Sequence, residues 1–177
     1  MSKLYHITYN KELTDTLKLI DLISKDDWID SNTILVTCSP DYSSNVTQLL
    51  NHKLSYLNSN ELYEQLFLEI PYPVMNQVWD RETQQYVNFD KYLLTWINKY
   101  ITSEFKYLFI DSATLSGNNF SKIKMTIRDK AEVRFASIYL QEDSKFTPDY
   151  FVERFDKKIK GGIIFEWENA NNKNWNY

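Results

Sequence analysis

The sequence predicts an α/β fold in which one mostly parallel, twisted sheet carries helices on both faces. Short runs of β-branched and aromatic residues alternate along the chain with longer segments of helical periodicity, which is the pattern of βαβ units. The 177 residues, 43% of them hydrophobic, are enough for one domain with a substantial core. No internal repeat or linker divides the chain, so we expect residues 1–177 to form a single domain.

The first half of the chain is predicted to hold two amphipathic helices around one buried strand, followed by a less regular region. The strand is the β-branched run Thr-Ile-Leu-Val-Thr-Cys. Four apolar residues of the first helix share one face: Leu13, Leu17, Ile20 and Ile23. The expected elements are a helix over residues 10–25, a strand over 33–38, a turn over 39–44, a helix over 45–53, a helix-like piece over 61–68, and a long loop or irregular hairpin over 74–85.

The second half alternates strands and helices more regularly. A stripe of apolar residues at helical spacing is predicted to face the core rather than a ligand: Phe89, Leu93, Trp96, Ile97 and Tyr100. The expected elements are a helix over residues 88–104, a strand over 107–110, a helix over 119–130, a strand over 132–140, a short helix over 148–155, a strand over 162–165, and a frayed, asparagine-rich tail over 169–177.

Composition excludes several classes of function. The net charge of −4 and the isoelectric point near 5.2 disfavour nucleic-acid binding through a broad basic face. The single cysteine, Cys38, excludes an internal disulfide and is expected to be a buried structural thiol, and no Cys/His cluster has zinc-site spacing. No apolar run approaches the ~20 residues of a membrane span, so we expect a soluble, cytoplasmic protein without membrane contact.

Residues 107–120, Tyr-Leu-Phe-Ile-Asp-Ser-Ala-Thr-Leu-Ser-Gly-Asn-Asn-Phe, have the layout of a phosphate-binding loop. An apolar strand ends at Asp111, a polar loop contains Gly117, and a helical pattern follows. Glycine lets a backbone approach a ligand, and the N-terminus of a helix offers unpaired N–H groups. Ligands of parallel sheets bind beyond the carboxyl ends of the strands. Because Cys38 and Ser39 also follow a predicted strand, we expect them to share one crevice with Asp111.

Two segments together resemble the type I phosphoribosyltransferases, and among them the purine-using branch. The first is residues 107–120; the second runs from Thr-Pro-Asp-Tyr-Phe-Val-Glu at 147–153 to Gly-Ile-Ile-Phe-Glu-Trp-Glu at 162–168. The resemblance implies that the first segment holds phosphoribosyl pyrophosphate (PRPP) with Mg²⁺, and that the second contributes to the nucleobase pocket. It also implies hood elements over residues 54–87 and 147–168. Many relatives dimerise, so a homodimer is one of the oligomeric states that stay open.

The resemblance assigns roles to individual residues. Asp111 matches the family's acid that binds the ribose hydroxyls, lies near the metal and takes part in catalysis. The matching phosphate-binding residues are Ser112, Thr114, Ser116, Gly117, Asn118 and Asn119. The base pocket corresponds to Ile163, Phe165 and Trp167, and the pyrophosphate loop to Ser39, Ser43 and Ser44.

The phosphate and pyrophosphate segments depart from the family pattern. Ser112 replaces a second acid, and Leu115 replaces the acid that assists chemistry at the base. Residues 38–44 contain neither glycine nor a basic residue, and Asp41 repels phosphate. With only 3 glycines in the chain, these changes favour binding over turnover. We expect Gly117→Val to abolish nucleotide binding while leaving a folded protein.

The base segment departs as well. Gly162 stands where an aromatic ring of the family stacks on the base, and Glu166 replaces a proline. Tyr139 or Trp79 is a candidate substitute for the missing ring, and Trp167 has the alternative role of anchoring the last strand.

Three functions therefore stay open. The first is an enzyme that transfers phosphoribose from PRPP to a purine-type base with release of pyrophosphate. The second is a catalytically impaired relative that binds PRPP or a nucleoside monophosphate as a sensor or regulator. The third is a protein-interaction scaffold.

Overall fold

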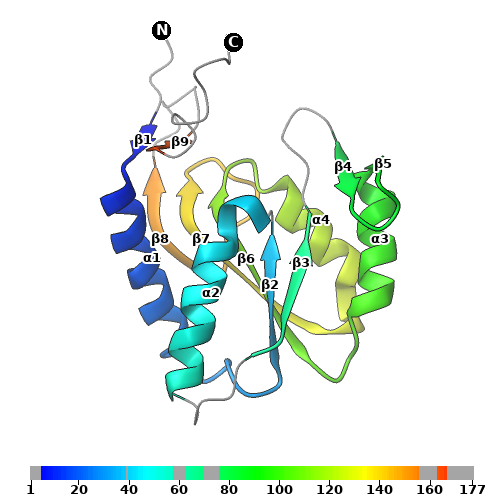
Figure 1. The fold of residues 1–177 in the computed structure, drawn as a ribbon, viewed down its shortest axis with the longest axis horizontal. Coiled ribbons are helices and arrows are strands. Elements are labelled where there is room, and N and C mark those ends of the chain that lie inside the picture. The colour runs from blue at the N-terminus through cyan, green and yellow to red at the C-terminus, as the bar shows by residue number, and fades with distance from the viewer. Residues whose placement is uncertain (1–4, 39, 58–62, 70–75, 156–162, 167–177) are drawn as a thin grey trace, which may run out of the picture.

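A five-stranded parallel sheet forms the centre of the computed structural model, which describes residues 5–38, 40–57, 63–69, 76–155 and 163–166 (Figure 1). The strand order is β3-β2-β6-β7-β8, and every neighbouring pair is parallel. The strands are β2 (Thr33–Cys38), β3 (Gln65–Leu68), β6 (Lys106–Thr114), β7 (Glu132–Gln141) and β8 (Tyr150–Phe155). The predicted α/β fold is confirmed.

Helices cover both faces of this sheet (Figure 1). They are α1 (Tyr9–Ile23), α2 (Pro40–Leu57), α3 (Phe89–Tyr100), α4 (Asn118–Ile127) and the short 3₁₀ helix η1 (Arg128–Lys130). Successive side chains of β2 point to opposite faces of the sheet and therefore belong to two different hydrophobic cores. Leu35 packs with α1 and α2, whereas Ile34 and Val36 pack with α3 and α4. Such a strand is buried on both faces, which explains its uninterrupted run of β-branched and apolar residues.

Two small strand pairs lie outside the main sheet. β1 (Tyr5–Ile7) pairs in parallel with β9 (Ile163–Phe165), and β4 (Gln77–Asp80) pairs antiparallel with β5 (Gln85–Asn88). In Figure 1 the β1–β9 pair is drawn at the same end of the molecule as the carboxyl ends of β7 and β8. Within the stretches expected to form a hood, β3 and β8 are strands of the main sheet, and the hood assignment stays a prediction.

Three local predictions are wrong. The described part of residues 61–68 and the segment 148–155 contain strands, β3 and β8, instead of helices. Short apolar runs cannot be assigned by periodicity alone, and pairing with β2 and with β7 decides for the strand. The turn expected after Cys38 is also wrong, because α2 already begins at Pro40. Proline is well tolerated in the first turn of a helix, where its missing N–H would have no partner.

The face that α1 buries differs from the predicted one. Ile20 and Ile23 are buried as predicted, but Leu13 and Leu17 are both 53% exposed. The rest of the buried face consists of Asp15, Thr16 and Leu19. By contrast, Phe89, Leu93, Trp96 and Ile97 of α3 are buried as predicted. No helix in the described part of the chain combines the length and the apolar character needed to span a bilayer.

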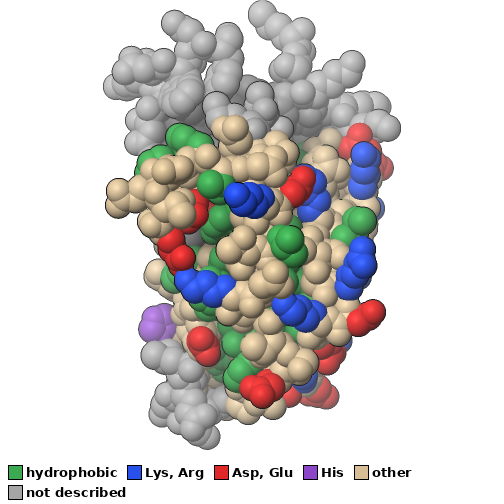
Figure 2. Space-filling view, turned by 90° about the vertical axis from the view of Figure 1, so that its right-hand side faces the viewer, with side chains coloured by type: hydrophobic (Ala, Val, Ile, Leu, Met, Phe, Trp, Pro, Cys, Tyr) green, Lys and Arg blue, Asp and Glu red, His purple; other side chains and the backbone are tan. Residues whose placement is uncertain are grey.

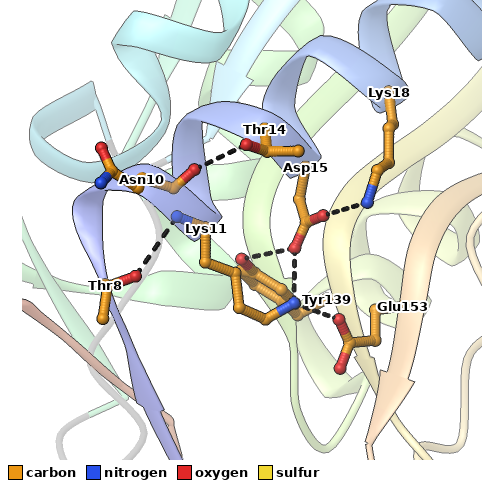
Figure 3. Close-up of polar contacts among 8 residues, drawn as sticks. All are labelled: Thr8, Asn10, Lys11, Thr14, Asp15, Lys18, Tyr139 and Glu153. Atoms are coloured by element: carbon orange, nitrogen blue, oxygen red, sulfur yellow. Dashed lines mark hydrogen bonds and ion pairs between the residues drawn. The ribbon is translucent and has the colours of Figure 1, made fainter.

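A polar cluster explains why α1 turns Asp15 inward (Figure 3). The buried carboxylate accepts hydrogen bonds from Lys11 Nζ at 2.8 Å, from Lys18 Nζ at 2.8 Å and from the Tyr139 hydroxyl of β7 at 3.1 Å. Lys11 also pairs with Glu153 of β8. Burial raises the pKa of Asp15, but the bonds from Lys11 and Lys18 outweigh it and the net pKa is lowered. The cluster fixes α1 to the edge of the sheet near β7 and β8.

Candidate phosphate-binding site

At its carboxyl end, β6 continues to pair with β7 after its pairing with β2 has stopped. Ile110 is the last residue of β6 that pairs with β2, whereas pairing with β7 continues to Thr114. Asp111 is therefore the first residue of β6 past the end of the β2 pairing. In register, Asp111 is level with Cys38, the last residue of β2, and parallel sheets bind ligands at the carboxyl ends of their strands. The expectation that this strand ends at Asp111 is wrong, because pairing with β7 carries β6 on to Thr114, and the crevice shared with Cys38 and Ser39 stays a prediction.

Asp111 is electrostatically unusual. Its carboxylate accepts a hydrogen bond from the backbone N–H of Ser112 at 2.7 Å, and no lysine or arginine in the described part of the chain forms an ion pair with it. Burial raises the pKa of Asp111 to about 7, and the Ser112 N–H offsets this only in part. Burial, and then the charge of Asp111, also raise the pKa of the buried Cys38 thiol. A carboxyl group whose pKa is strongly raised by burial, with no described cation beside it, is a candidate functional group.

The residues after Asp111 divide into an interior and a surface set. Ser112 and Thr114 are buried, and the Thr114 hydroxyl donates to Ser137 Oγ of β7 at 3.0 Å. Ser137 Oγ in turn donates to the Tyr139 carbonyl oxygen at 3.1 Å, which continues the chain of hydroxyl groups inside the sheet. Three of the predicted phosphate-binding residues reach the surface: Ser116, Asn118 and Asn119.

Gly117 connects this strand to α4. Its φ of 73° is in the left-handed region, and it is the N-cap residue of the helix. A Cβ atom here would lie 2.6 Å from the backbone nitrogen of Phe146 and 2.6 Å from Ser144 Oγ. The glycine is thus required by a protein contact, so Gly117→Val is expected to lower the stability of the fold in addition to any effect on nucleotide binding. The Asn118 N–H donates to Ser116 Oγ at 3.3 Å, which shapes the entry to α4.

The other predicted residues lie around the same edge or outside the described chain. Ser43 and Ser44 belong to the first turns of α2, and Ser39 and Trp167 lie outside the described residues. Ile163 and Phe165 are the end residues of β9. The assignment of the three serines to pyrophosphate binding, and of Ile163, Phe165 and Trp167 to base binding, stays a prediction.

Glu166, which follows β9, has a contact that sequence reasoning did not anticipate. Its carboxylate accepts a hydrogen bond from the Tyr9 backbone N–H at 2.7 Å, at the first residue of α1. An acidic group stabilises the N-terminus of a helix, so Glu166 ties the β1–β9 pair to α1. Of the two rings considered for base stacking, Tyr139 is buried and bonded to Asp15. Trp79 is 46% exposed and meets Tyr86 edge-on, 5.2 Å between centroids.

Comparison with solved structures identifies the fold. The chain is similar to a xanthine-guanine-hypoxanthine phosphoribosyltransferase of Helicobacter pylori, with 19% identity, a TM-score of 0.60 and 97% of each chain covered. It is also similar to a purine phosphoribosyltransferase from Pyrococcus horikoshii Ot3, with 13% identity, a TM-score of 0.58 and 94% of each chain covered. The chain has the fold of the type I phosphoribosyltransferases.

The chain is also similar to a hypothetical protein from Neisseria gonorrhoeae whose crystal structure contains bound ppGpp. It shares 11% identity with the chain at a TM-score of 0.62, over 97% of this chain and 96% of the other. No protein-family model matches the sequence, and no curated protein matches it. The likeness is therefore carried by the three-dimensional arrangement, and the type I resemblance of the two sequence segments agrees with it.

The surface of this phosphoribosyltransferase fold is mixed in charge on the side that carries α3 and the β4–β5 hairpin. Figure 2 shows lysine and arginine side chains scattered there among acidic ones instead of forming one basic area. Lys99 pairs with Glu82 at 2.5 Å and Lys122 with Asp90 at 2.7 Å on this side. These pairs neutralise cations that a polyanion would need.

Proposed function

We propose that this protein binds a nucleoside monophosphate or PRPP at the carboxyl edge of β6 and acts as a sensor or regulator without turnover. The observation that carries the proposal is Asp111. It is the one carboxylate that β6 brings to this edge, its pKa is raised to about 7 by burial, and no described cation pairs with it. Next to it, β6 leads through Gly117 into the N-terminus of α4.

Each group at this edge has a role in the proposed complex. The N–H groups of the first turn of α4, with the side chains of Ser116, Asn118 and Asn119, bind the 5′-phosphate. Asp111 accepts hydrogen bonds from the ribose hydroxyls, which it does best when ionised. Ser112, Thr114 and Gly117 hold the loop from inside. Base contacts fall to β9 with Ile163 and Phe165, and to Trp167.

The neighbouring residues favour binding over catalysis. Transfer from PRPP requires neutralisation of the leaving pyrophosphate. Here a single residue, Ser39, separates β2 from α2, and Asp41 adds a negative charge in the first turn of that helix. Leu115 packs partly buried against the core and cannot exchange a proton with a base. Ser112 supplies no second carboxylate.

The Neisseria gonorrhoeae protein supports a nucleotide as the ligand. That protein has the same fold and was solved with bound ppGpp, a guanine nucleotide. A relative of this fold can thus hold a purine nucleotide. We propose the same ligand class for the present chain, a purine nucleoside phosphate.

The second candidate is Mg²⁺-dependent transfer of phosphoribose from PRPP to a purine-type base. The position of Asp111 and the fold shared with two purine phosphoribosyltransferases favour it. The described residues contain no group of three or more metal-binding side chains. Asp111 therefore fits Mg²⁺ only as one carboxylate that acts together with the phosphates of a ligand, an arrangement common for this ion. There Mg²⁺ would neutralise phosphate charge.

Calorimetric titration with GMP, IMP and PRPP, each with and without Mg²⁺, tests the proposal. We expect saturable binding of GMP or IMP that weakens at least about tenfold in Asp111→Asn. The matched control is Asp129→Asn, which removes an exposed carboxylate in η1. Binding without pyrophosphate release from PRPP and guanine, hypoxanthine or xanthine supports the sensor. Release of pyrophosphate establishes the transferase instead, and no binding of any of the three ligands overturns both.

A further inference from the structure

The segment that joins β7 to β8, residues 142–149, is part of the wall of the phosphate loop. The backbone N–H of Lys145 donates to the carbonyl oxygen of Ser116 at 3.1 Å. The space next to Gly117 is filled by the backbone nitrogen of Phe146 at 2.6 Å and its Cβ at 2.7 Å, measured from where a Cβ atom of Gly117 would be. This close approach requires a glycine, so the two segments fit each other in one arrangement.

Phe146 is held firmly from its other side. Its ring meets Phe120, in the first turn of α4, edge-on at 5.7 Å between centroids, and Phe135 of β7 edge-on at 4.9 Å. Phe120 and Phe135 are themselves 4.9 Å apart, so the three rings form one cluster. Edge-to-face aromatic pairs at these distances are favourable beyond the area that they bury. The cluster connects the sheet, the start of α4 and the backbone beside Gly117.

We infer that Phe146 is a positioning residue for phosphate binding: it holds Gly117 in its left-handed conformation and so keeps the N–H groups of the first turn of α4 aimed at the ligand. This inference rests on the proposed function and adds a residue to it. Without this support the loop would sample several conformations, and ordering it when the ligand binds would lower the affinity of the protein for that ligand. The loss applies to ligands with a phosphate and spares those without one.

The test compares GMP with guanosine in Phe146→Leu. We expect the affinity for GMP to fall about tenfold while the affinity for guanosine is unchanged, so that the ratio of the two falls by the same factor. Phe146→Tyr keeps an aromatic ring against Phe120 and Phe135 and should restore part of the ratio. The ratio is insensitive to a general loss of stability at temperatures where the variants are folded.

The matched control is Phe105→Leu. Phe105 packs partly buried against the same core, but it precedes β6 and therefore lies at the opposite end of the strand from Gly117. A lower GMP-to-guanosine ratio in Phe146→Leu but not in Phe105→Leu supports the inference. An unchanged ratio in Phe146→Leu, or an equal fall in both variants, overturns it while the proposed function stands. A wild-type protein that does not prefer GMP over guanosine overturns the proposed function first, and the inference with it.

Discussion

Replacement of Asp111 by asparagine should stabilise the protein, and the gain should increase with pH. The pKa of Asp111 is raised from 3.8 to about 7 because partial burial of its carboxylate disfavours the charged form and no cation among the described residues pairs with it. Between these two values the unfolded chain is ionised while the folded protein holds a proton, so ionisation works against folding as the pH rises. Asparagine removes this dependence and can still accept the hydrogen bond from the Ser112 N–H.

The size of the effect follows from the shift. With this pKa difference, ionisation of Asp111 lowers the free energy of unfolding by about 4 kcal/mol at pH values above the folded pKa. Near pH 5 the same loss is about 1.6 kcal/mol. The difference between those two figures is an upper limit, since water that reaches the half-buried side chain reduces it. We therefore expect the advantage of Asp111→Asn to grow by about 1–2 kcal/mol between about pH 5 and about pH 8.

Urea denaturation followed by tryptophan fluorescence, repeated across this pH range, measures the free energy of unfolding directly. Asp129→Asn serves as the control, because that side chain is exposed and its replacement should leave the pH dependence of the wild type unchanged. Parallel curves for the wild type and Asp111→Asn would refute the reasoning, because they would mean that Asp111 titrates alike in the folded and unfolded chain. A stabilised variant that has also lost ligand binding is the pattern expected of a functional acid.

Two further predictions concern stability. Asp15→Asn should lower the free energy of unfolding by about 1–3 kcal/mol at neutral pH, because Lys11 and Lys18 lose their buried partner. Since the net pKa of Asp15 is lowered, the loss should shrink as the pH falls through its folded pKa, which urea melts in acid would show. Gly117→Ala should cost at least about 2 kcal/mol, because its φ of 73° and the contact with Phe146 both resist a side chain. A Gly117→Ala protein with the same urea midpoint as the wild type would show that the two segments do not touch.

Much of the fold could be predicted because the signals are local. The apolar stripe of α3 from Phe89 to Ile97 has a period that only a buried helix face explains, and Asn88 caps that helix by accepting hydrogen bonds from the N–H groups of Asp90 and Lys91. The β2 run and the buried Cys38 are equally local. The alternation of strands and helices also predicted a strand that leads to Asp111, although that strand continues to Thr114.

Other features depended on partners that are distant in sequence. Tyr150–Phe155 forms a strand because β7 offers it an edge, and the short run itself is compatible with a helix. The inward face of α1 is set by Asp15, which is polar and would be assigned to solvent without Tyr139 and the two lysines.

The sequence by itself determined the α/β class, most of the helices and strands, and which residues follow the apolar part of β6. These features depend on hydrophobic periodicity, which is a local property of the sequence. Only the tertiary structure decided which of those residues are accessible, that Asp111 has a pKa near neutrality, and that Gly117 is required by Phe146. Burial and close contacts depend on tertiary packing, because they arise where the sheet brings together segments that are far apart in sequence.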